Sequence, residues 1–172
     1  IMGSFIVSSI RRRNLLRQLE RMSYRDQLTQ FGNRYAVDWF VEHEWNGEQI
    51  GVVYCDITGL KKVNDEQGHE AGDRLIIRAC ECLAGVFKGY GLYRIGGDEF
   101  LVLCLGIEEK DLREHVEKLR MDMKEHQVTM AVGMIWKEHG PKDIDLLLNE
   151  SERLMYEDKD RYYKEHGLKR RR

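Results

Sequence analysis

The chain has 172 residues, and its 28 Lys and Arg against 30 Asp and Glu give a formal net charge of −2. With 42% hydrophobic residues and one proline, it has the composition of an ordinary soluble domain, which excludes disordered, collagenous and fibrous proteins. The near-neutral charge argues against nucleic acid as a partner, and four cysteines without C-x-x-C or zinc-finger spacing indicate a reducing, cytoplasmic compartment.

The first 25 residues are expected to form a connector ahead of the folded domain. An apolar run over residues 1–10 precedes three arginines and is too short to cross a bilayer, which takes about 20 residues. The run is typical either of the cytoplasmic end of a membrane helix or of a cloning remnant. Leucines over residues 14–22 recur at helical spacing, which predicts a helix that either begins the domain or pairs with a second copy as a coiled coil. The chain begins with Ile1, so we interpret it as a piece of a longer protein.

Helical and strand patterns alternate after residue 26. A helix is predicted over residues 34–45, and a dense β-branched run beside two glycines predicts a buried strand over 50–57. A helical pattern over 73–87 comes next, followed by strands over 92–95 and 99–105 whose Gly-Gly connection is typical of a hairpin. The last predicted elements are a charged helix over 108–126, a strand over 128–136 and a long helix over 144–166.

The core order of strand, helix, strand, strand, helix, strand predicts an α+β fold. This is the ferredoxin-like, split βαβ arrangement, an antiparallel sheet whose flanking helices lie on one face. Such a fold indicates no particular function by itself. The function must therefore be inferred from individual side chains.

The chemistry of the sequence concentrates around two acidic positions. Gly96 and Gly97 stand at the tip of the predicted hairpin, where missing Cβ atoms let a bulky polyanion approach, and Asp98 and Glu99 follow at once. Asp56 ends the buried strand that is expected to lie beside this hairpin. Neighbouring carboxylates repel each other unless a cation lies between them, and hard oxygen ligands suit Mg²⁺ or Mn²⁺. An exposed acidic hairpin is the alternative interpretation.

These residues belong to a wider pattern that resembles the GGDEF-domain diguanylate cyclases, which condense two GTP into cyclic di-GMP and two pyrophosphates. The resemblance covers residues 26 to about 164. It rests on five motifs in order: Asp26-x-Leu28-Thr29 with Asn33-Arg34; Asp56-Ile57 leading through Lys61 to Asn64-Asp65; Gly68-His69-x-x-Gly72-Asp73; Gly96-Gly97-Asp98-Glu99-Phe100; and Met155-Tyr156 with Lys159.

The resemblance implies a domain organisation as well as a fold. The expected fold is a βαββαβ palm core of the nucleotidyl cyclase type with an antiparallel sheet. The expected divisions are a connector over residues 1–25, a GGDEF domain over 26–166 and a basic tail over 167–172. We also expect an upstream sensor in the full-length protein. The predicted location is cytoplasmic, and membrane anchoring of the full-length protein stays an open alternative.

The resemblance further implies roles for individual residues. Mg²⁺ or Mn²⁺ would be held by Asp56, the backbone carbonyl of Ile57, Asp98 and Glu99, and Asp98 is the candidate base for a ribose 3′-hydroxyl. The implied GTP site consists of Leu60, Lys61, Asn64, His69, Asp73, Gly96, Gly97 and Lys159. Within this site, Leu60, Lys61 and Lys159 would contact phosphates.

Asn64 and Asp73 would bind the guanine edge, whose paired donors adenine lacks, so the carboxylate of Asp73 favours GTP over ATP. For Asp73 the alternative is an N-cap of the predicted helix. For Asp26 we prefer a cap or a salt bridge to a catalytic role.

The sequence departs from the family pattern at several positions. Thr58 stands where many members carry a second aspartate, Leu60 where they often carry Phe, and Tyr163 where a second cation often follows the lysine. Phe87 and Tyr90 replace the Arg and Asp of the product-inhibition site. We therefore predict no tight feedback inhibition through that site.

One domain holds one GTP, so the reaction requires a homodimer in which two domains face each other about a two-fold axis. We expect this dimer to form through the domain face and the N-terminal helix. The leading hypothesis is a diguanylate cyclase output domain. Two alternatives stay open: a non-catalytic GTP-binding or protein-interaction domain, which Thr58 and Tyr163 allow, and a palm-fold cyclase with another nucleotide, against which Asp73 argues.

Overall fold

The computed structural model describes residues 10–15, 18–19 and 23–168. Residues 10–15 and 18–19 are helical, in agreement with part of the predicted connector helix, whereas most of the apolar run before it lies outside the described residues. Within the described part of the chain, no helix has the length and apolar character that crossing a membrane requires.

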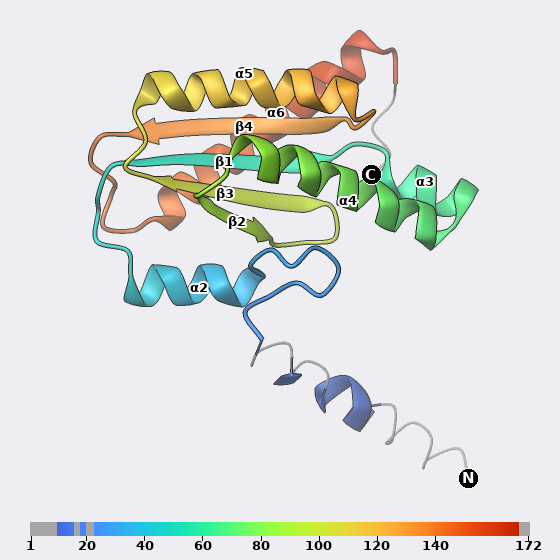
Figure 1. Cartoon of the computed structure of the whole chain (residues 1–172), viewed down its shortest axis with the longest axis horizontal. Coiled ribbons are helices and arrows are strands. Elements are labelled where there is room, and N and C mark those ends of the chain that lie inside the picture. Colours follow the sequence, from blue (N-terminus) through green and yellow to red (C-terminus); the bar gives the residue numbers. More distant parts are fainter. Residues whose placement is uncertain (1–9, 16–17, 20–22, 169–172) are drawn as a thin grey trace.

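The predicted elements of the domain are present (Figure 1). In chain order they are α2 Arg34–His43, β1 Ile50–Ile57, α3 Leu60–Gln67, α4 His69–Val86, β2 Gly91–Arg94, β3 Glu99–Leu105, α5 Glu109–Glu125, β4 Met130–Lys137 and α6 Asp145–Glu165. Their bounds agree with the sequence analysis to within two residues, except in the region of α3 and α4.

The helix predicted over 73–87 is longer, and a separate short helix precedes it. α4 begins at His69, after Gly68, whose φ of 88° is a left-handed conformation that glycine adopts without strain. The preceding helix α3 buries only Leu60, so its sequence lacks the apolar repeat that reveals a helix. Asp73 consequently lies in the second turn of α4, and its alternative role as an N-cap is wrong.

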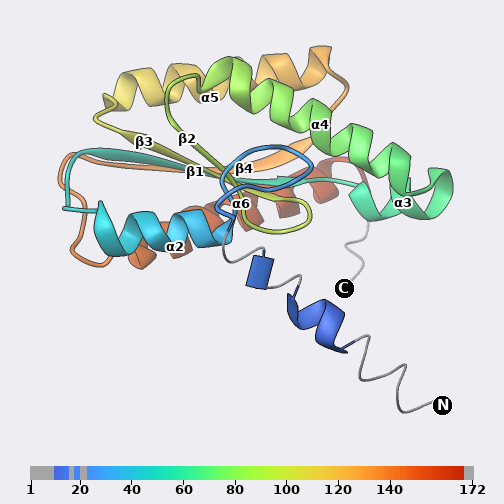
Figure 2. The same ribbon diagram turned by 60° about the horizontal axis from the view of Figure 1, so that its bottom comes forward.

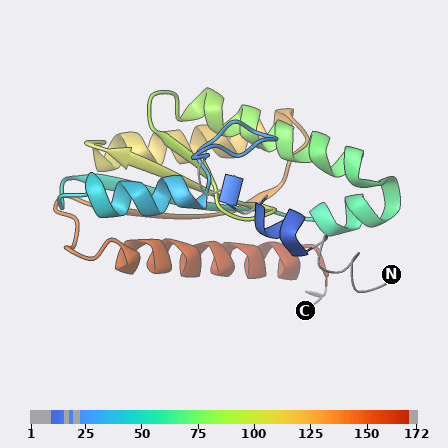
Figure 3. The ribbon, with the colours of Figure 1, turned by 90° about the horizontal axis from the view of Figure 1, so that it is seen from below.

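The four strands form one antiparallel sheet in the order β2-β3-β1-β4, as the split βαβ arrangement requires. α4 and α5 cover one face of this sheet, and α2 and α6 lie on the opposite face (Figures 2 and 3). The two helices of the predicted core therefore cover a single face, as expected. α2 and α6 lie outside the βαββαβ core and bury the second face as well.

β1 is apolar almost throughout because it is buried on both faces. Val53 and Ile57 contribute to the core beneath α4 and α5, whereas Val52 and Tyr54 contribute to the core beneath α2 and α6. The same alternation places Asp56 on the α6 side of the sheet, where only 5% of its surface is exposed. A carboxylate this deeply buried needs a charged or hydrogen-bonding partner. Its burial therefore makes Asp56 a candidate site residue.

Candidate active site

The predicted acidic residues meet at one end of the sheet, the end at which α3 also lies (Figure 1). Asp56 near the end of β1 is paired in register with Glu99, the first residue of β3. The amide of Ile57 donates a hydrogen bond of 2.9 Å to the carbonyl of Asp98, which ties the glycine tip of the hairpin to β1. Antiparallel pairing thus brings together the acids that the sequence analysis singled out.

α6 contributes a cation to this group of acids. Nζ of Lys159 lies 2.7 Å from Oδ1 of Asp56, and the exposed fractions of the two side chains are only 16% and 7%. Either charge would be costly to bury alone, so the pair is favourable only while both partners are present. Lys159 thus neutralises the most deeply buried of the acids.

The pKa of Glu99 is raised above its ordinary value of 4.5. Burial is the largest cause, and the negative charges of Asp98, Asp56 and Glu152 follow. A long hydrogen bond, with 3.4 Å between Oη of Tyr54 and Oε1 of Glu99, acts in the opposite direction. The acids around Glu99 therefore leave an excess of negative charge that a bound cation would relieve.

The two glycines at the hairpin tip have different surroundings. A Cβ on Gly96 would lie 2.6 Å from Oε2 of Glu99, closer than van der Waals contact allows, so this glycine makes room for the carboxylate. Within the described part of the chain, a Cβ on Gly97 would have no heavy atom within 4 Å, which leaves this position open to an approaching ligand. Arg94 fixes the tip, because its guanidinium donates to the carbonyl of Gly97 at 2.7 Å.

The guanidinium of Arg94 also binds Asp26, with 3.2 Å between Nη1 and Oδ2. The same carboxylate accepts hydrogen bonds from the amide and the hydroxyl of Thr29, at 2.9 and 2.7 Å. Burial by itself would raise the pKa of Asp26, but the bonds from Thr29 and the charge of Arg94 lower it below its ordinary value. The preferred role of Asp26 in a salt bridge is confirmed.

The chemical type of the donor atoms suits a hard divalent cation, because Asp56, Asp98 and Glu99 are all carboxylates with oxygen donors. The charge excess at Glu99 points in the same direction. Among the residues described, no three His, Cys, Asp or Glu side chains converge closely enough to form a metal site by themselves. A cation here would therefore need oxygen ligands from outside these side chains, such as those of a nucleotide phosphate.

The two predicted guanine-binding residues lie on neighbouring helices, Asn64 on α3 and Asp73 on α4. A Cβ on Gly72 would overlap Oδ1 of Asn64, so the amide group of Asn64 rests directly on the backbone of α4, next to Asp73. A hollow of about 310 Å³ at the exposed carboxylate is lined by Asp73, Arg74, Ile77 and Arg78. Asn64 does not line this hollow, so the carboxylate of Asp73 and the apolar side chain of Ile77 are the groups that it offers to the edge and the face of a purine.

Three other predicted GTP residues belong to the same corner. Leu60 begins α3 with its side chain buried in the core, so only its backbone is available to a phosphate. Lys61 follows it in the first turn of α3 and is exposed, and His69 is exposed at the start of α4. The structure thus places Asn64 against Gly72, the residue before Asp73, and presents Lys61 and His69 to solvent.

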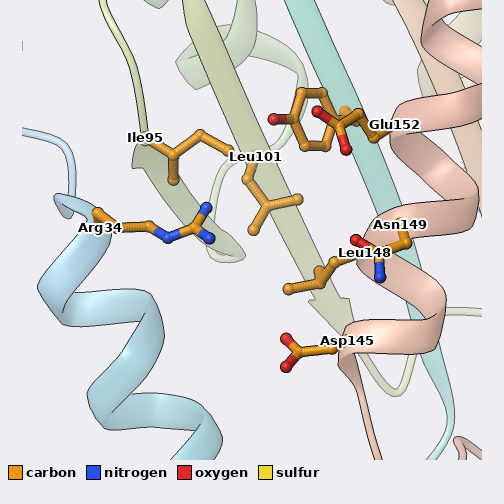
Figure 4. A pocket seen from close by; sticks show the side chains of 8 residues that line it. Arg34, Ile95, Leu101, Asp145, Leu148, Asn149 and Glu152 are labelled. Atoms are coloured by element: carbon orange, nitrogen blue, oxygen red, sulfur yellow. The ribbon is translucent and has the colours of Figure 1, made fainter.

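A second, smaller cavity lies on the other side of the acidic group, between α2 and α6 (Figure 4). Its volume of about 110 Å³ has room for a few water molecules and not for a nucleotide. Arg34 of α2 and Asp145, Asn149 and Glu152 of α6 line it (Figure 4). Tyr54 borders the same cavity, and burial, with the nearby charges of Glu99 and Glu152, raises its pKa, so the phenol stays protonated.

Comparison with known proteins assigns the family. A family model described as "Diguanylate cyclase, GGDEF domain" matches residues 23–164. The chain belongs to this family. The bifunctional diguanylate cyclase/cyclic di-GMP phosphodiesterase MucR of Pseudomonas aeruginosa is 29% identical over 172 residues, which cover 91% of the chain and 25% of MucR. The cyclic di-GMP phosphodiesterase PdeR of Escherichia coli is 30% identical over 159 residues, which cover 83% of the chain and 23% of PdeR.

The fold of this GGDEF domain agrees with that of solved relatives. The crystal structure of the coiled coil and GGDEF domain of DgcB from Caulobacter crescentus, in complex with c-di-GMP, has a TM-score of 0.71. It is 20% identical, and the match covers 97% of this chain and 94% of that one. The α+β palm fold is therefore confirmed. The chain spans about a quarter of the length of MucR and PdeR.

Two further residues, Tyr54 and Asp158, lie beside the candidate site residues of this GGDEF domain and were not predicted by the sequence analysis. Tyr54 lies two residues before Asp56, and the alternation of β1 could have placed both on the same side of the sheet. Asp158 precedes Lys159 and accepts a hydrogen bond from the backbone of β4. No sequence signal reveals that contact, because it exists only once α6 has packed on the sheet.

Proposed function

We propose that this GGDEF domain is a diguanylate cyclase, a nucleotidyltransferase that joins two GTP into cyclic di-GMP and releases two pyrophosphates. The observation that carries the proposal is the meeting of Asp56, Glu99 and Lys159 beside a glycine tip that is open at Gly97. Acids that attract a cation and a lysine that attracts phosphate are the groups that phosphoryl-group chemistry requires.

In this proposal Asp56, Asp98, Glu99 and the backbone carbonyl of Ile57 hold Mg²⁺ or Mn²⁺. The cation, when bound, would polarise the α-phosphate and stabilise the leaving pyrophosphate. Lys61 and Lys159 supply positive charge to the phosphates. Asp98 would accept the proton of the ribose 3′-hydroxyl, because it lies beside the open glycine tip and is less buried than Asp56.

Guanine would bind at the corner of α3 and α4. Asp73 accepts from the paired N–H donors of the guanine edge, and Asn64, which packs against Gly72, adds its amide from α3. Hydrogen bonds to a charged acceptor are each worth about 1.5–3 kcal/mol, and adenine lacks the paired donors. The family match also supports GTP as the substrate.

Two domains would have to cooperate, because each 3′-hydroxyl attacks the α-phosphate held by the other domain. A homodimer with two-fold symmetry provides that arrangement. In the proposal, the domain face and the N-terminal helix form the dimer, and an upstream sensor aligns the two copies.

A second candidate function is a GGDEF domain that binds GTP or a protein without catalysis. Thr58 replaces a second acid at the end of β1, and its buried hydroxyl has no hydrogen-bond partner among the residues that the structure describes. Tyr163 replaces a second cation on α6. The similarity to PdeR, a phosphodiesterase, agrees with this alternative.

The test is incubation of the purified protein with GTP, ATP or both in the presence of Mg²⁺, followed by separation of the nucleotides. We expect cyclic di-GMP from GTP alone, with specific activity that falls on dilution. Asp98→Ala should abolish the product, whereas Asp111→Ala, an exposed acid on α5, should not. If concentrated protein forms no product, the cyclase proposal is wrong and the non-catalytic binding domain is favoured instead.

A further inference from the structure

The second half of α6 has little apolar attachment to the rest of the domain. Near its middle, α6 packs closely on β4, because a Cβ on Gly133 would overlap backbone atoms of Ser151 and Met155. Met155 is also the last buried residue of the helix, and the described residues 156–165 are exposed or partly exposed. Lys159 therefore lies on a segment that apolar packing does not hold in place.

A polar contact from Asp158 holds this segment instead. Oδ2 of Asp158 accepts a hydrogen bond of 2.8 Å from the backbone amide of Val132 in β4, which is an edge strand of the sheet. The same oxygen lies 3.3 Å from Nη2 of Arg120, which extends from α5. Only 17% of the Asp158 side chain is exposed. One carboxylate thus joins α6, the edge strand and α5.

The next residue along the helix is Lys159, whose ammonium reaches Asp56 in β1. We propose that Asp158 is a positioning residue, which fixes the second half of α6 against β4 so that Lys159 meets Asp56. This inference rests on the proposed function, in which Lys159 also binds GTP phosphate. The physical reason is entropic. A lysine on a loosely attached helix would lose more conformational entropy on reaching its partner than a lysine on a helix that is already fixed in place.

The competing explanation is that Asp158 only stabilises the fold by satisfying an edge amide of β4. A double-mutant cycle separates the two roles. If Asp158 acts through Lys159, its removal should hardly weaken nucleotide binding once Lys159 is gone. If it only stabilises the fold, the effects of the two substitutions on binding should multiply.

The binding probe is guanosine 5′-(α,β-methylene)triphosphate with MgCl₂, because this analogue cannot release pyrophosphate, and calorimetry gives its Kd without turnover. We expect Asp158→Ala and Lys159→Met each to raise Kd by about tenfold, and the double variant to resemble Lys159→Met. A Kd raised by about a hundredfold in the double variant would overturn the inference. Glu150→Ala, an exposed acid of the same helix, is the matched control and should leave Kd unchanged.

A milder variant and a second measurement keep the test decisive. Asp158→Asn retains an oxygen for the amide of Val132, so its Kd should rise by less than about threefold. Hydrogen exchange of the backbone amides over residues 156–165 reports on the helix without any nucleotide. Exchange should accelerate in Asp158→Ala and not in Glu150→Ala, and unchanged exchange would refute the positioning role. Absence of analogue binding by the unmodified protein would contradict the proposed function instead.

Discussion

Gly96→Ala is the substitution whose effect can be worked out most directly from the structure. The new Cβ would lie 2.6 Å from Oε2 of Glu99, so the oxygen must retreat by roughly 0.8 Å to reach an ordinary contact of 3.4 Å. The carboxylate is the free end of a side chain and can rotate, at a cost of about 1 kcal/mol for leaving its preferred rotamer. Folding should therefore suffer little.

Activity should suffer far more than stability. Misplacement of a reacting or ligand group by about 1 Å costs on the order of 100-fold in rate. We expect Gly96→Ala to lower kcat by about 10- to 100-fold and to raise the Mg²⁺ concentration that gives half-maximal rate, since Glu99 is proposed to hold the cation.

The assay combines initial rates of cyclic di-GMP formation across a Mg²⁺ titration with urea unfolding of the same preparations. Gly97→Ala is the matched control for stability, because a Cβ there would have no heavy atom of the described residues within 4 Å. Its unfolding midpoint should equal that of the unmodified protein. A Gly96→Ala variant with an unchanged rate and an unchanged Mg²⁺ requirement would refute the role assigned to the Glu99 carboxylate.

Three further predictions follow from individual contacts. Gly133→Ala should lower the free energy of unfolding in urea by about 2–3 kcal/mol, because its Cβ would overlap the backbone of α6, which cannot rotate away. At pH 7.5 without divalent cations, Glu99→Gln should raise the thermal midpoint, which corresponds to a gain of less than about 1 kcal/mol in the free energy of unfolding. The reason is that the raised pKa of Glu99 means that its ionised form opposes folding. This gain should shrink as pH falls through the raised pKa toward 4.5, and a gain that persists at pH 4 would contradict it. Cyclic di-GMP should not inhibit noncompetitively at low micromolar concentration, because Phe87 and Tyr90 replace the Arg and Asp of the product-inhibition site. Phe87 is fully buried, and the ring of Tyr90 lies 6.1 Å from the ring of His115.

Much of the fold could be predicted from the sequence because its strands have strong local patterns. β1 is rich in β-branched residues and β3 follows a glycine pair, so both were predicted with correct bounds. α3 was missed because it buries a single residue, and a helix without an apolar stripe has no periodicity to detect. The cover of the second sheet face by α2 and α6 was also missed, since strand order alone does not say where helices outside the core will pack.

The acidic part of the site could be predicted for a different reason. Asp56 and the segment after Gly96 carry unusual charge where the pattern predicts buried or tightly turning backbone, so their chemistry is visible without coordinates. Asn64 and Asp73 came only through the family resemblance, and the structure explains them by the close approach of α3 to α4 at Gly72. Tyr54 was not predicted as a site residue, because an aromatic residue in a strand usually packs in the core.

By itself, the sequence determined which residues carry charge, which segments form strands, and that the chain resembles a nucleotide-condensing family, because these properties are local. Only the tertiary structure decided which charges meet. The pairing of Lys159 with Asp56 joins residues that are far apart in the chain, and the anchoring of Asp158 on Val132 depends on how α6 docks. Such contacts depend on packing across the sheet, and no local pattern in the sequence records that packing.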